Sequence, residues 1–140
     1  MSATQLNPWR GRIVLLTLVH GVGTIGYTSV MTMAPVIRAD LDLNATQVGS
    51  FMSAFYFALT LGAIPAGALA DRLGVALSLS LASFLMALGA GLFAAISSYV
   101  PAVIATFVMG LGYALVNPAT AKGVLNWFKP EHRATAMGVK

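Results

Sequence analysis

Polar side chains that could bind a solute stand at helical spacing within long apolar stretches of this 140-residue chain. In the first stretch, Thr17, His20, Thr24 and Tyr27 follow one another at steps of three, four and three residues. This spacing places the four side chains on one face of a helix. Polar groups are costly inside an apolar helix and usually face a bundle interior or a wet cavity. The stripe therefore indicates a site for a polar solute.

A second polar stripe lies in a later apolar stretch, where Tyr113 and Asn117 share a helix face with Gly110. Two simpler explanations remain open. Serine and threonine hydroxyls can bond back to carbonyls of their own helix. A histidine can donate one buried hydrogen bond instead of titrating near neutral pH, which would suit proton coupling. From both stripes we predict the following substrate-binding residues: His20, Thr24, Tyr27, Tyr113 and Asn117.

Catalytic chemistry is not indicated by the remaining polar residues. The four acidic side chains, Asp40, Asp42, Asp71 and Glu131, all lie between the apolar stretches, so no carboxylate pair falls within one. The chain has no cysteine, which excludes disulfides, thiolate metal sites and cysteine nucleophiles. We therefore predict a protein that is not an enzyme, with no catalytic residues, no metal site and no cofactor.

The composition is that of a membrane protein, with 58% hydrophobic and 9% charged residues. Soluble domains carry roughly 25% charged residues. The charges flank apolar stretches that are each long enough for a hydrocarbon core, which needs about 20 residues. The net charge of +4 resides in these flanks, so it does not indicate nucleic-acid binding. The predicted setting is a lipid bilayer, with no nucleic acid as a partner.

Turn and capping residues divide the chain into helical spans. Asn44 and Gln47 have the spacing of a capping box before the second span, and Pro101 suits the first turn of the fourth. The predicted fold is all-α: a polytopic membrane helix bundle of four transmembrane helices plus the start of a fifth, with residues 1–140 as one N-terminal transmembrane bundle. The predicted spans are 13–37, 47–70, 75–96 and 101–125, and the fifth begins at about residue 136.

Positive charges and small residues predict the orientation and the packing. Short cytoplasmic loops are rich in lysine and arginine, which predicts a multi-pass protein of the cell inner (plasma) membrane with a cytoplasmic N-terminus. Small residues recur four apart and allow close helix packing; they are Gly62, Ala66 and Ala70 in the second span, and Ala87 and Gly91 in the third. The inner segments hold Arg10, Arg12, Arg72, Lys122, Lys129 and Arg133, and the outer loops hold Arg38.

The segment GALADRLG at residues 67–74 resembles the signature of the major facilitator superfamily, which lies between that family's helices 2 and 3. The trailing basic pair of the signature is replaced here by Val75 and Ala76. The segment NWFKPEHRATAMG at residues 126–138 looks like the family's connection between helices 4 and 5. Together, these matches extend over nearly the whole chain. The resemblance implies an inner-loop gating motif formed by Gly67, Asp71, Arg72 and Gly74.

The resemblance also implies a partial major facilitator fold and a function. The chain would be the N-terminal portion of a secondary active transporter that moves a small solute by alternating access, with organic acids among the candidate solutes and symport as the expected coupling. Its partners would be the small-molecule substrate, the lipid bilayer and the missing C-terminal half. A second hypothesis is a small four-helix membrane scaffold or assembly subunit. The scaffold predicts a stop after Lys140, whereas the transporter predicts a reading frame that continues into the fifth helix.

Overall fold

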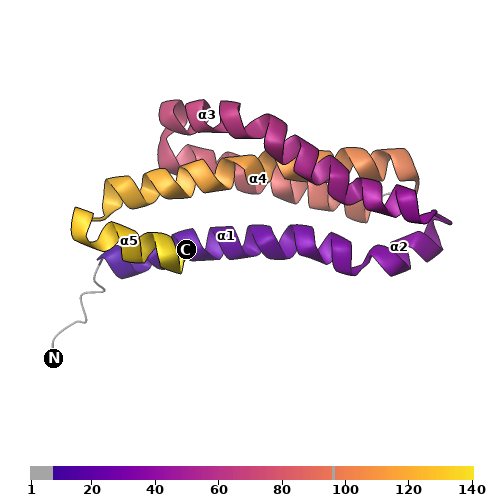
Figure 1. The fold of residues 1–140 in the computed structure, drawn as a ribbon, viewed down its shortest axis with the longest axis horizontal. Coiled ribbons are helices and arrows are strands. Elements are labelled where there is room, and N and C mark those ends of the chain that lie inside the picture. Colours follow the sequence, from indigo (N-terminus) through magenta and orange to yellow (C-terminus); the bar gives the residue numbers. More distant parts are fainter. Residues whose placement is uncertain (1–7, 96) are drawn as a thin grey trace.

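A computed structural model describes residues 8–95 and 97–140, with side chains from residue 11 onward. The described residues form helices and connecting turns, as the all-α prediction requires. Two long apolar helices and one very long one make up most of the bundle (Figure 1). The helices are α1 (Pro8–Thr32), α2 (Ala34–Asp40), α3 (Ala45–Ala94), α4 (Tyr99–Trp127) and α5 (Pro130–Val139).

Helix α3 is folded back on itself at Gly74. Its backbone has φ 76° and ψ 177° there, a conformation open essentially to glycine alone. The chain reverses direction at this bend, so that α3 consists of two arms, residues 45–73 and 75–94 (Figure 1). Among the described residues, α1, α3 and α4 are long and apolar enough to cross a membrane. Because the 50 residues of α3 form two arms, the bundle has four apolar passes.

The start of α3 follows the prediction, whereas the end of the first helix does not. The side chain of Asn44 accepts from the Gln47 backbone N–H at 2.9 Å, and the Gln47 side chain accepts from the Asn44 N–H at 2.9 Å, which confirms the capping box. The first helix was predicted to reach residue 37 but ends at Thr32. Pro35 has no N–H to continue the hydrogen-bond ladder, so a new helix, α2, begins around it.

Helix α5 begins earlier than the fifth span that the sequence predicts at about residue 136. It starts at Pro130, in the first turn, where the fixed φ of proline favours a helix and no N–H is needed. Residues 130–135 are therefore helical and precede the apolar run. Figure 1 places α5 beside the first turns of α1 and at the same end of the bundle as the bend of α3. Helix α2 lies at the opposite end.

Glycines let α4 pack directly against both arms of α3. A Cβ atom on Gly62 of the first arm would stand 2.9 Å from the Ala114 Cβ. A Cβ on Gly110 would press on the Phe55 carbonyl oxygen and stand 2.8 Å from the Ala58 Cβ. The predicted packing face of Gly62, Ala66 and Ala70 is confirmed, because all three are buried.

On the second arm, the prediction that Ala87 and Gly91 allow close helix packing is wrong. Both are exposed, and nothing lies within 4 Å of a Cβ built on Gly91. The close approach is made by Gly89, whose Cβ would stand 2.8 Å from the Ala105 carbonyl oxygen. Ala82 and Met86 share that buried face because they precede Gly89 by helical steps, whereas the face that holds Ala87 and Gly91 points away from α4.

The glycine contacts predict a large difference between two alanine substitutions. Gly110→Ala should lower the free energy of unfolding by about 1–3 kcal/mol, because the added methyl group must displace α3 backbone. Gly91→Ala, at an open position within the helix, should leave it unchanged or raise it by up to about 1 kcal/mol, because alanine favours a helix more than glycine does. Denaturation of the purified variants in mixed micelles, followed by circular dichroism, measures both. Equal stability of the two variants would contradict the packing described here.

Candidate functional site

A chain of polar groups joins α1 to α4 within the bundle. The hydroxyl of Thr24 donates to the His20 carbonyl oxygen at 3.0 Å, so the Tyr113 hydroxyl is the donor in its own 3.1 Å bond to Thr24. The Tyr113 oxygen also lies 3.4 Å from Nε2 of His20. This arrangement favours the tautomer that carries its proton on Nε2, and it leaves the buried Nδ1 of His20 without a partner.

Aromatic rings extend the cluster toward α3. Tyr27 stacks on Phe55, with ring centroids 4.7 Å apart, and meets Tyr113 edge to face at 5.7 Å. Tyr56 lies edge to face with Tyr27 at 6.4 Å. Phe55 and Tyr56 were not among the predicted site residues. The sequence shows an aromatic pair in the second span, but the side to which the two rings point depends on how the helices pack.

Asn117 is the predicted site residue that stays outside the cluster. It follows Tyr113 by one helical turn on α4, its side chain is exposed, and no hydrogen bond of that side chain falls among the described contacts. Hydroxyls in the second span, by contrast, follow the simpler explanation. Ser53 and Thr60 each donate to a carbonyl of their own helix, at 3.2 and 2.9 Å. Four of the five predicted residues, His20, Thr24, Tyr27 and Tyr113, therefore lie together.

At the bend of α3, the gating motif meets α4 through Lys122. The Lys122 ammonium lies 3.1 Å from a carboxylate oxygen of Asp71 and donates to the carbonyls of Ala70 and Asp71 at 3.1 and 3.0 Å. A cation at a helix C-terminus is favourable because the last carbonyls lack partners. Asp71 is 79% exposed, so the ion pair itself contributes little, about 0–1 kcal/mol.

Two other residues of the motif have open space around them. The side chain of Arg72 is exposed, and nothing lies within 4 Å of a Cβ built on Gly67. Gly74 supplies the bend itself, through its positive φ. The sequence could not identify Lys122 as the partner of Asp71, because the two residues are 51 positions apart and no local pattern links them.

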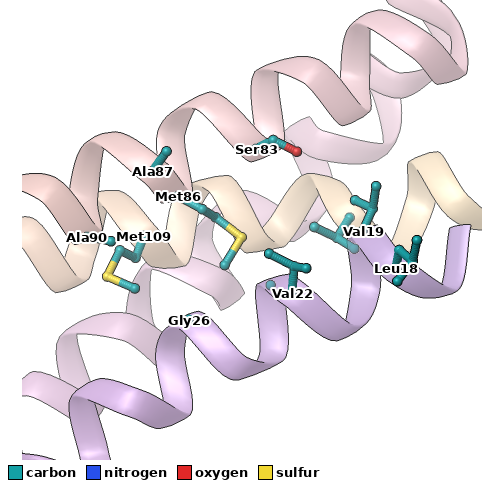
Figure 2. Close-up of a pocket in the computed structure, with 11 residues that line it drawn as sticks. Leu18, Val19, Val22, Gly26, Ser83, Met86, Ala87, Ala90 and Met109 are labelled. Carbon is teal, nitrogen blue, oxygen red and sulfur yellow. The ribbon is translucent and has the colours of Figure 1, made fainter. Parts of the chain in front are cut away.

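A pocket of about 320 Å³ lies between α1 and the second arm of α3 (Figure 2). Val19 and Val22 of α1 line it opposite Met86 and Ala87 of α3, and Ser83 provides the polar side chain of the lining. Such a lining offers few groups that could orient a polar solute. The polar groups that could bind a solute therefore lie in the His20–Thr24–Tyr113 cluster rather than around this pocket. Within residues 8–95 and 97–140, no three histidine or acidic side chains gather as metal ligands would.

Comparison with known proteins gives a family and a set of relatives. The family model described as Major Facilitator Superfamily matches residues 16–140. A probable L-galactonate transporter of Escherichia coli K12 is 29% identical over 126 residues, which cover 90% of this chain and 28% of that protein. A hexuronate transporter of Bacillus subtilis 168 is 31% identical, over 91% of this chain and 30% of the relative.

A further relative is a 4-hydroxybenzoate transporter of Pseudomonas aeruginosa, which is 33% identical over 94% of this chain and 29% of its own length. The chain thus spans less than a third of the length of each of these relatives. No solved structure matches it.

Cysteine accessibility tests whether the cluster borders water. The chain lacks cysteine, so single substitutions can be labelled cleanly. Cysteines at Thr24, Tyr113 and Asn117 should react with a small water-soluble thiol reagent in reconstituted protein. Cysteines at Phe84 and Leu88, two exposed apolar positions of the second α3 arm, should react slowly because lipid covers them. Equal protection at all five positions would show that the polar residues serve packing alone.

Proposed function

The chain belongs to the Major Facilitator Superfamily, and we propose that it is the N-terminal part of a secondary active transporter that moves a small organic acid across the inner membrane. The solutes named for its relatives, galactonate, hexuronate and 4-hydroxybenzoate, all carry a carboxylate. The chain spans under a third of each relative, so the remaining helices would form the opposing half. Alternating access would then proceed by rocking of the two halves around a midplane site.

The contact between Tyr113 of α4 and His20 and Thr24 of α1 is the observation that carries this proposal. Polar and ionisable groups within a membrane bundle face its interior or a water-filled cavity, and a histidine among them is a candidate for a solute pathway. Hydroxyl and imidazole groups suit an acid that bears hydroxyls, and the rings of Tyr27 and Tyr113 offer an aromatic wall. Asn117, exposed one turn from Tyr113, would contact the solute from the side of the missing half.

The gating motif would act at the cytoplasmic end. Gly67 has open space around it, which leaves room for a helix of the opposing half to approach closely. The exposed side chain of Arg72, and the carboxylate oxygen of Asp71 that does not bond to Lys122, would bond to that half and hold the outward-open state. Coupling would be by symport, with His20 as the residue that could exchange a proton near neutral pH.

Reporter fusions test the proposed orientation. The bend at Gly74, α5 and the start of α1 lie at one end of the bundle, and this end carries most of the lysine and arginine residues (Figure 1). A reporter fused after Arg72 or Arg133 should therefore be cytoplasmic, and one fused after Ser98 should be outside. An external reporter at Arg72 would contradict this topology.

Solute uptake tests the function itself. The protein encoded by the natural reading frame, reconstituted in liposomes, should take up at least one of L-galactonate, a hexuronate or 4-hydroxybenzoate. Tyr113→Phe keeps the ring but removes the hydroxyl that bonds Thr24, and it should reduce uptake about tenfold, as expected for a lost hydrogen bond in a solute site.

The matched control is Tyr99→Phe. This substitution removes a similar hydroxyl. In the native protein, the Tyr99 hydroxyl contacts Ser50 at 2.8 Å where α4 begins, away from the cluster. This variant should transport at the wild-type rate. If none of the three acids enters the liposomes, or if the two variants behave alike, the proposed solute path is wrong.

A further inference from the structure

The ammonium group of Lys140 lies against the buried face of α4. Its Nζ donates to Oγ1 of Thr120 at 2.8 Å, and Thr120 is fully buried. The Thr120 hydroxyl directs its own proton to the Val116 carbonyl at 2.7 Å, so it acts only as an acceptor for Lys140. An ammonium has three donors. Two of them therefore have no bonding partner among the described residues.

No carboxylate of the chain balances this charge. All four acidic residues lie in the part of the chain that the structure describes, and Lys122–Asp71 is the ion pair found there. The Lys140 side chain is only partly exposed. An unpaired charge taken out of water is costly, and charged side chains within membrane bundles mark binding sites or ion pathways. A counter-anion for Lys140 would come from outside the described residues, either from the rest of the protein or from a bound solute.

The Lys140 ammonium contacts α4 about two helical turns from the polar cluster. Tyr113, seven residues before Thr120 on that helix, contacts His20 and Thr24 of α1. Helix α5 thus places the Lys140 cation on the face of α4 that carries the buried hydroxyl of Thr120. An anion at this point would contact the ammonium donors, while the rest of the same molecule could reach the hydroxyls of Tyr113 and Thr24.

We infer that Lys140, held against α4 by its hydrogen bond to Thr120, forms the subsite that binds the carboxylate of the transported acid. This inference rests on the proposed function and adds an orientation to it. The carboxylate points toward α5, and the hydroxyl-bearing or aromatic part points toward Tyr113 and Tyr27. The charge of Lys140 selects acids over neutral sugars of the same size.

Equilibrium binding to the purified protein from the natural reading frame tests the subsite. Calorimetric titration with L-galactonate, D-glucuronate and 4-hydroxybenzoate gives the Kd of each acid. Lys140→Gln should raise Kd about tenfold or more, because a charged hydrogen bond is lost. Lys140→Arg, which keeps the charge, should stay within about threefold of the wild type. Lys129→Gln removes an exposed charge between α4 and α5 and should leave Kd unchanged.

Amine labelling of the wild-type protein gives a second readout that needs no variant to fold. Acetic anhydride should modify Lys140 more slowly when the bound acid covers it, while labelling of Lys129 should be unaffected; mass spectrometry measures both.

Unchanged Kd for Lys140→Gln, absence of protection at Lys140, or failure of all three acids to bind would overturn the subsite. Uptake measured in parallel separates this inference from the function. Binding that depends on Lys140 without any uptake supports the subsite and contradicts the transporter. Uptake of an acid, together with a Kd that Lys140→Gln leaves unchanged, contradicts the subsite alone.

Discussion

The close approach of α4 to both arms of α3 is the constraint on which the rest of the bundle depends. Lipid offers no hydrophobic drive between helices, so association relies on packing, and small residues permit the tightest packing. Gly110 and Gly112 place the α4 backbone against carbonyl oxygens of Phe55 and Ala82. Successive helix positions differ by about 100°, so a face fixed by Gly112 turns the next residue, Tyr113, toward α1, where its ring also lies beside Phe55 of α3. The polar cluster is thus a consequence of glycine packing.

Helix α1 is held mainly along this polar contact and the apolar cluster around Leu16. A Cβ atom on Gly23 would stand 3.3 Å from both Met86 and Tyr113, so the glycine lets the α1 backbone lie close to the cluster. The other side of α1 carries exposed apolar side chains, including Val14 and Ile25, which lipid or further helices would cover. A helix that is joined to its neighbours by hydroxyls and rings can part from them for a polar solute at a smaller cost than one held by interlocked backbone. This combination of a rigid α3–α4 pair and a less tightly held α1 suits a solute path.

Local patterns predicted most of the elements and part of the site. Capping by Asn44 and Gln47, the four apolar passes and the stripe of His20, Thr24 and Tyr27 depend on neighbours within a few residues, so the sequence alone reveals them. The partner of Asp71, the packing role of Gly89 and the inward position of Lys140 depend on how whole helices rotate about their axes, which periodicity does not define. Membership of the family favours the transporter over the four-helix scaffold that the sequence also allowed.

The central claim is that a small acid binds where α4 meets α1, at Tyr113. An experimental structure of the protein from the natural reading frame, determined with a brominated or iodinated 4-hydroxybenzoate bound, tests it most directly. The account predicts density for the heavy atom next to Tyr113 and Tyr27, with the carboxylate toward Lys140. Density confined to the apolar pocket between α1 and the second arm of α3, or to the bilayer-facing surface, would contradict it.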